Sequence, residues 1–590
     1  MKAPIILIAT LLSLPIASGQ DKYFGRSNDR NGHAKVARDL DTVNPASLID
    51  VIVQFRQTPT QRHHQKVTNR GGRLKTGLEA INGGHYSMQA GELAELANDS
   101  DVVHISPDRA VKGSLDYSAQ ATGAGIALSN GWDGTGIGIA VIDSGVDDVK
   151  DLQGLGKPSS WKSRTVYSQS FLPGSENVIG NDQYGHGTHV AGIIAGNGGS
   201  SDGSGYSRTF RGIAPRAEIV NLRVLDATGA GRDSYVIAAI QRAIALKTTY
   251  KIRIINLSLG RPVFESYKTD PLCQAVEAAW KAGIVVVVAA GNNGRDNTLG
   301  RSGYGTVNSP GNDPYVITVG AMKTKKTPAR GDDEIASYSA KGPTTVDHVA
   351  KPDLVAPGNQ IVSSVKNGKD WILQQYPQNL VPASYFDYTP PATEPFKYLW
   401  LSGTSMATPM VSGAAALMLQ KEPGLKPDQV KARLMKTATK SFPYFSTATD
   451  PVTNQLYTSQ YDLFTVGAGY LDIMAALNNQ DVSAKTAMSP TVIRDATGKY
   501  RLVRHASALW GESALWGESA VWGEQVMVRG YSALWGESAL WGESAVWGDS
   551  TSQAFSALWG ESALWGESAL WGEGNTRMVE STNVLMNGEK

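Results

Sequence analysis

The chain has 590 residues, more than one ordinary domain holds, so the sequence predicts several domains. Hydrophobic residues make up 41% of it and charged residues 18%, which is enough apolar content for a large core. The formal net charge of +1 does not indicate electrostatic binding to nucleic acid or to an acidic membrane surface.

The N-terminus has the pattern of a secretory signal peptide. Its first residues, MKAPIILIATLLSLPIASGQ, hold a lysine, an apolar run over 5–14 and then small residues, with cleavage expected after Gly19. The apolar run is too short to span a bilayer well, although an uncleaved anchor is the alternative. No later stretch of the sequence is apolar for long enough to cross a membrane. We therefore expect a secreted protein, free or associated with the cell surface, with a signal peptide at 1–19.

A small α+β unit is expected at 48–113, after a polar linker at 20–47. Residues 47–57 (SLIDVIVQFRQ) alternate between apolar and polar side chains as a strand does. Further along, the pattern indicates a short helix over Glu92–Ala97 and a strand over Val102–Ser106.

The next part of the chain, 114–478, is predicted to form an α/β domain. Continuous apolar strands alternate there with helical patterns, which is typical of a mostly parallel sheet covered by helices on both faces. In such sheets, sites form at the carboxyl ends of the strands. The expected strands are 136–145, 217–226, 252–260, 284–291 and 315–322, and the expected helices are 233–250 and 271–283.

Three polar side chains stand where that rule places a site. Asp143 ends a strand, His186 opens the helical run HGTHVAG, and Ser405 lies where a polar turn enters an apolar helix. A serine hydroxyl is a poor nucleophile unless a base removes its proton, and a histidine base needs an acid partner to fix its tautomer. His186 and His189 could instead bind zinc, but no HExxH pattern supports that, and we expect His189 to be a packed residue of the same helix.

The sequence motifs around these three residues, and their order in the chain, resemble those of one family. VIDSGV, HGTHVAG and GTSMATP resemble the three active-site segments of the subtilisin-like serine proteases, the subtilases, and the resemblance spans roughly 126–478. AAGNNG resembles the oxyanion-hole segment of that family, which assigns Asn292 to this role. NLSLG matches the edge strand that pairs with substrate backbone, and the substrate-binding residues implied are Ser258, Leu259 and Gly260.

The resemblance implies a three-layer subtilisin-like fold and a secreted serine endopeptidase. It makes Ser405 the nucleophile, His186 the base and Asp143 the group that orients the base. It implies protein or peptide substrates, an acyl-enzyme intermediate and no cofactor for catalysis. The alternative is a surface adhesion or binding protein whose protease fold is inert.

Two further features follow from the family resemblance. The unit at 48–113 resembles the subtilase propeptide, which implies a zymogen inhibited by its own propeptide and cut between Lys112 and Ala124; a permanent N-terminal domain is the alternative. Calcium commonly stabilises this family, and Asp151 resembles a calcium ligand, with a solvated acidic loop as the alternative.

About two dozen extra residues between Gly358 and Ser405 depart from the short family members. Their aromatic and proline content predicts an ordered excursion near the rim of the cleft, which either shapes substrate preference or decorates the surface.

The C-terminal part is a tryptophan-rich hexapeptide-repeat tail. Nine hexapeptides of the type SALWGE occupy 507–573, between a linker at 479–506 and a tail at 574–590. A β-rich or disordered adhesive region is favoured over a regular solenoid, since blocks of repeats are separated and tryptophan is bulky for a tight coil. The repeats carry acidic but no basic residues, which argues against nucleic acid, and their ligand is unknown.

Overall fold

The computed structural model divides the chain into two compact units, residues 1–111 and 112–590. The signal peptide and nearly all of the hexapeptide repeats lie outside the residues whose structure is described. The described residues are 35–37, 40, 43–107, 117–154, 162–175, 181–298, 300–366, 368–393, 395–481, 486–494, 500–503, 526–528, 531–533 and 582–589.

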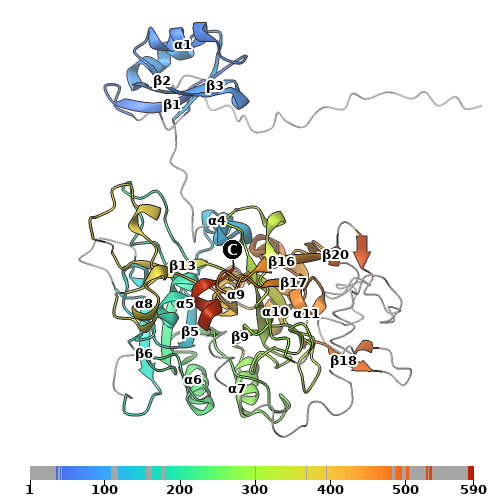
Figure 1. The fold of residues 1–590 in the computed structure, drawn as a ribbon. Helices are drawn as coiled ribbons and strands as arrows, with labels where there is room; N and C mark the ends of the chain where they lie inside the picture. Colours follow the sequence, from blue (N-terminus) through green and yellow to red (C-terminus); the bar gives the residue numbers. More distant parts are fainter. Residues whose placement is uncertain are drawn as a thin grey trace, which may run out of the picture. The chain divides into compact units, whose positions relative to one another are not determined.

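The N-terminal unit is an antiparallel sheet with two helices (Figure 1). Its strands are paired in the order β2-β3-β1-β4. Apolar side chains that alternate along β1, such as Val51 and Val53, are fully buried against Val67 and Leu96 of the helices. The α+β prediction for this unit is confirmed. The elements are β1 (Leu48–Phe55), α1 (Gln61–Thr68), β2 (Arg73–Leu78), β3 (Gly83–Gln89), α2 (Leu93–Ala97) and β4 (Val102–Pro107).

The second unit is built on an eight-stranded sheet. Its strands run in the order β11-β10-β9-β8-β5-β7-β6, and β12 pairs with β10. All the pairings are parallel except that of β11 with β10. The five strands predicted from the sequence are β5, β7, β8, β9 and β10. The strands are β5 (Gly138–Asp143), β6 (Thr165–Ser170), β7 (Glu218–Arg223), β8 (Ile252–Leu257), β9 (Val285–Ala289), β10 (Ile317–Lys323), β11 (Glu334–Ile335) and β12 (Leu354–Pro357).

Helices cover this sheet on both faces, as the sequence predicted. On one face α5 (His186–Ala195) and α9 (Thr404–Lys421) pack together, and on the other α6 (Asp233–Leu246) lies beside α7 (Pro271–Lys281) (Figure 1). α9 is buried over almost its whole length, which explains why its sequence is apolar or small on every side.

The remaining elements surround these three layers. A two-stranded sheet of β13 (Ile361–Ser364) and β14 (Tyr398–Leu401) leads into α9, and the extra residues noted in the sequence connect its strands. The other helices are α3 (Ser118–Thr122), α4 (Ala124–Ser129), α8 (Trp371–Gln375), α10 (Pro427–Thr437), α11 (Leu463–Val466) and α12 (Ile473–Asn478). The other strands are β15 (Ser441–Phe442), β16 (Phe445–Thr449), β17 (Leu456–Gln460), β18 (Thr491–Arg494), β19 (Tyr500–Val503), β20 (Val526–Val528) and β21 (Tyr531–Ala533).

The connection between β13 and β14 is packed around aromatic side chains, so the predicted ordered excursion is present. Phe386 is fully buried and meets Phe210 and Tyr398 edge to face, at ring-centroid distances of 5.8 and 5.4 Å. Within the part of the chain that the structure describes, no helix has both the length and the apolar character needed to cross a bilayer.

A buried charge cluster joins β12 to α10. Asp353 accepts a hydrogen bond from Lys351 Nζ at 2.7 Å, and Lys431 Nζ lies 3.4 Å from its other oxygen. All three side chains are fully buried. Burial by itself would raise the pKa of the Asp353 carboxyl, but the two lysines outweigh burial and lower it.

Asp353→Asn is expected to lower the free energy of unfolding by about 3–5 kcal/mol, because two buried lysines lose their counter-charge. The midpoint of urea unfolding measures the loss. Arg211→Gln is the matched control, since it removes the exposed ion pair with Asp202 and should change the free energy by about 0.5 kcal/mol or less. Equal midpoints for the two variants would show that the cluster does not stabilise the fold.

Candidate active site

Asp143 and His186 meet at the carboxyl end of the central strand β5. Asp143 is the last residue of β5 and is fully buried, and His186 is the first residue of α5. The His186 Nδ1–H donates to Asp143 Oδ1 at 2.7 Å. The sequence therefore predicted correctly that these two side chains, 43 residues apart, lie together.

The backbone at the start of α5 packs closely against the backbone that follows β5. A Cβ atom on Gly187 would lie 2.1 Å from the Gly145 carbonyl oxygen and 3.2 Å from the Asp143 Cβ, so the position requires glycine. The Gly187 N–H also donates to Ser144 Oγ at 2.9 Å. These contacts hold the start of the helix, and with it His186, against Asp143.

Asp182 organises the same helix start, and the sequence analysis did not single it out. Its Oδ1 accepts hydrogen bonds from the Gly185 N–H and from Ser144 Oγ, at 2.7 and 2.8 Å. Its Oδ2 accepts from the Thr188 N–H at 2.7 Å. A carboxylate satisfies the unpaired N–H groups of a helix N-terminus and complements its positive dipole. An aspartate just before a helical run is a known start signal, and it could have pointed to this residue.

The charge of Asp143 governs the protonation of His186. Burial alone would lower the pKa of this imidazole, but the Asp143 charge and hydrogen bond, with a contribution from Asp182, raise it above its ordinary value. His186 is thus held in the tautomer with a proton on Nδ1, which leaves Nε2 to act as a base.

His189 has a structural role on the same helix, as predicted. Its Nε2 contacts the carbonyl oxygens of Ile361 and Leu399, at 3.0 and 3.1 Å, and so ties α5 to β13 and β14. Burial, with the nearby His186, lowers its pKa to about 3, so it stays neutral.

Ser405 lies across a cleft from His186. The two residues line one cavity of about 620 Å³, together with Ser258, Leu259 and Gly260. Ser405 is the second residue of α9, and its Oγ donates to the Ser258 carbonyl oxygen at 3.1 Å. Among the hydrogen bonds of the described residues, none joins Ser405 to His186. The hydroxyl is therefore placed at the site but points to the edge segment.

Asn292 lines the same cleft just beyond β9. Its Oδ1 accepts from the Thr404 N–H and Oγ1, at 2.9 and 3.1 Å, which fixes the amide and leaves its Nδ2 for another acceptor. A Cβ on Gly403, whose φ is +148°, would lie 3.1 Å from this Nδ2, so glycine keeps that space open.

Asp151 lies away from the cleft and was the candidate calcium ligand. Its carboxylate is buried and accepts hydrogen bonds from the Ser200 N–H at 2.6 Å and from Ser364 Oγ at 2.9 Å. Each carboxylate oxygen of Asp151 thus accepts a hydrogen bond from a protein donor, an arrangement that stabilises the carboxylate without a metal ion. Throughout the described ranges, no group of three or more histidine, cysteine, aspartate or glutamate side chains that could hold a metal ion is found.

Comparison with known proteins gives the same family as the motifs. A sequence profile of the Subtilase family matches residues 134–469. Serine protease AprX of Bacillus subtilis (strain 168) is 35% identical over 375 residues, which cover 62% of this chain and 76% of that protein. Subtilisin E of the same organism is 31% identical over 396 residues, with coverages of 66% and 84%.

One similar solved structure is described as a cold adapted subtilisin-like serine proteinase. Its sequence is 29% identical, and the match covers 52% of this chain and 83% of that chain, with a TM-score of 0.36. The family profile extends over the strand ends and helix starts that carry Asp143, His186, Asn292 and Ser405. The chain therefore belongs to the subtilase family and is a subtilisin-like serine endopeptidase.

Proposed function

We propose that the protein is a secreted endopeptidase that cuts peptide bonds with Asp143, His186 and Ser405 through an acyl-enzyme. The observation that carries this proposal is the 2.7 Å hydrogen bond between Asp143 and His186, beside a cleft that also holds Ser405. A buried carboxylate bonded to Nδ1 orients the imidazole and stabilises its charged form.

In the proposed mechanism, Ser405 turns from the Ser258 carbonyl and gives its proton to His186 Nε2 as its Oγ attacks the peptide carbonyl. The hydrogen bond to His186 forms when substrate is bound, since such contacts are often loose in free enzymes. The oxyanion receives hydrogen bonds from Asn292 Nδ2 and the Ser405 N–H, at the positive end of α9. His186 then protonates the leaving amine, and water releases the acyl group by the same steps.

The cleft favours a broad, apolar substrate preference. Apolar residues that line it include Leu225, Val236 and Phe264. Asp233, an acidic residue of the lining, is paired with Arg261 at 2.8 Å, so it is not left to select a basic side chain. The segment Ser258–Gly260 is proposed to pair with substrate backbone.

The N-terminal unit is proposed to be a propeptide that inhibits the enzyme until it is exported and is then cut off between Lys112 and Ala124. The support is that 48–107 folds within a compact unit that has its own core and that follows the proposed signal peptide in the sequence. Catalysis as proposed uses no cofactor, and the hydrogen bonds of Asp151 do not favour a structural calcium ion there.

A fluorophosphonate probe tests this function on the mature enzyme. We expect labelling of Ser405 that is lost in Ser405→Ala and in His186→Ala, because the hydroxyl needs the base. Ser129→Ala, a change on the surface helix α4, is the control and should be labelled like the parent. A folded, mature parent enzyme that takes no label would favour the inert binding protein instead.

Asn292→Ala removes one donor to the oxyanion. We expect kcat to fall by about 10²–10³-fold with KM little changed, a loss already known for the corresponding substitution in subtilisin and borrowed from it. Steady-state kinetics on a peptide amide measures both constants. A fall in affinity alone would place Asn292 in substrate binding.

The pH profile tests the charge of Asp143. His186 must be neutral to accept a proton, and its pKa is raised above 6.5, so kcat/KM should fall on the acid side of a pKa above that value. Asp143→Asn removes the charge that raises the pKa, so the acid limb should move to lower pH while kcat falls by about 10⁴-fold. The exposed Asp148→Asn is the matched control, with no movement expected. An acid limb that stays in place in Asp143→Asn would contradict the assignment.

A further inference from the structure

The last described residues, 582–589, pack against the catalytic unit. They form a short helix over 582–587, red in Figure 1, and two further residues. Val584, Leu585 and Met586 are buried in the main core of the unit, with exposed fractions of 1%, 8% and 5%. Part of the predicted C-terminal tail, beyond the hexapeptides, thus belongs to the body of the enzyme.

Hydrogen bonds fix this segment beside the nucleophile. The Ser402 N–H, three residues before Ser405, donates to the Leu585 carbonyl oxygen at 2.9 Å. Asn359 holds the backbone of Glu589 from both sides, donating from Nδ2 to its carbonyl oxygen and accepting its N–H, each at 2.9 Å. Between them, Gly588 has a φ of +59°, and a Cβ there would lie 2.3 Å from Ser402 Oγ. Position 588 therefore requires glycine for the segment to pack here.

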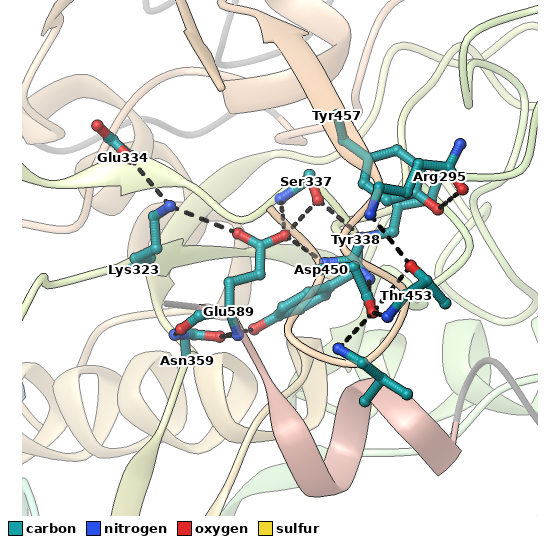
Figure 2. A network of polar contacts seen from close by, with 12 residues as sticks. Arg295, Lys323, Glu334, Ser337, Tyr338, Asn359, Asp450, Thr453, Tyr457 and Glu589 are labelled. Carbon is teal, nitrogen blue, oxygen red and sulfur yellow. Dashed lines mark hydrogen bonds and ion pairs between the residues drawn. The ribbon is translucent and has the colours of Figure 1, made fainter. Parts of the chain in front are cut away.

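The Glu589 side chain lies in a buried cluster of charged and polar side chains (Figure 2). Its Oε1 accepts hydrogen bonds from Arg295 Nη2 at 2.8 Å and from the Ser337 N–H at 2.9 Å. Lys323 Nζ lies 3.7 Å from Oε2. Glu589 is 1% exposed, and a buried carboxylate is stable only where such partners compensate its charge. The network therefore anchors the end of the segment.

Leu585 reaches the active-site cleft. It lines the same cavity as His186, Asn292 and Ser405. With the segment in place the cavity still has about 620 Å³, so the segment bounds the cleft and does not fill it.

We propose that residues 582–589 form a wall of the substrate cleft, with Leu585 as a residue that selects substrate side chains and Glu589 as its anchor. This inference rests on the proposed function, because it requires peptides to bind beside Ser405.

Substitutions of Leu585 in the full chain test the wall. A mixed peptide library is digested and its products are sequenced to give relative kcat/KM at each substrate position. We expect Leu585→Ala to favour large side chains at one position by about tenfold, and Leu585→Phe to disfavour them at that position, as pocket volume dictates. Leu456→Ala, an exposed leucine of β17, is the matched control and should leave the preferences unchanged.

Glu589→Gln tests the anchor, because it keeps the shape and removes the charge. We expect faster amide hydrogen exchange over 582–589 and a change in preference at the same substrate position.

If Leu585→Ala does not accumulate in folded form, Leu585→Met and Leu585→Phe provide the comparison.

The outcomes separate this inference from the proposed function. Unchanged preferences in the Leu585 variants, with Ser405 still labelled by the probe, would overturn the wall and leave the endopeptidase. An active mature enzyme whose mass shows that 582–589 is absent would overturn the wall as well. A parent enzyme that takes no label would overturn the proposed function itself.

Discussion

The active site depends on keeping one buried carboxylate next to one imidazole. Asp143 is fully enclosed at the end of β5, and its charge is tolerated because His186 donates to it at 2.7 Å. That contact requires the helix α5 to start almost on top of the strand end. Gly187 permits the approach, and Asp182 ties the first turn of α5 to Ser144. The contact between Asp143 and His186 therefore depends on how closely the backbone of α5 can pack against the end of β5.

Two histidines on one helix show how the surroundings decide a residue's role. His186 faces a carboxylate, which raises its pKa, whereas burial lowers the pKa of His189 to about 3 despite its contacts with two backbone carbonyls. Nothing in the spacing of HGTH distinguishes them. In the proposed mechanism the His186 imidazole exchanges protons, whereas His189 remains a neutral link between α5 and the strands β13 and β14.

Features encoded by neighbouring residues could be predicted, and those set by distant contacts could not. The buried strands around β5 are continuous apolar runs, and Asp143, His186 and Asn292 stand at strand ends or helix starts that short motifs mark. β6 was not predicted, because TVYSQS is a polar edge strand without such a run. The surroundings of Asp151 and of Glu589 come from segments far apart in the chain, so no local pattern shows whether a carboxylate binds a metal ion or an arginine.

The borders of the cleft are also set by distant segments. The ring of Trp371, in the connection between β13 and β14, packs on that of Tyr184, a residue of the cleft lining, at a centroid distance of 5.5 Å. The Tyr184 ring lies 6.2 Å from that of His186. Leu585 borders the same cleft but lies beyond the residues 134–469 that match the family profile. The family profile therefore covers Asp143, His186 and Ser405, whereas Leu585 reaches the cleft from a segment outside the profile. In the function proposed above, substrate choice can change through that segment without any change in the buried contact between Asp143 and His186.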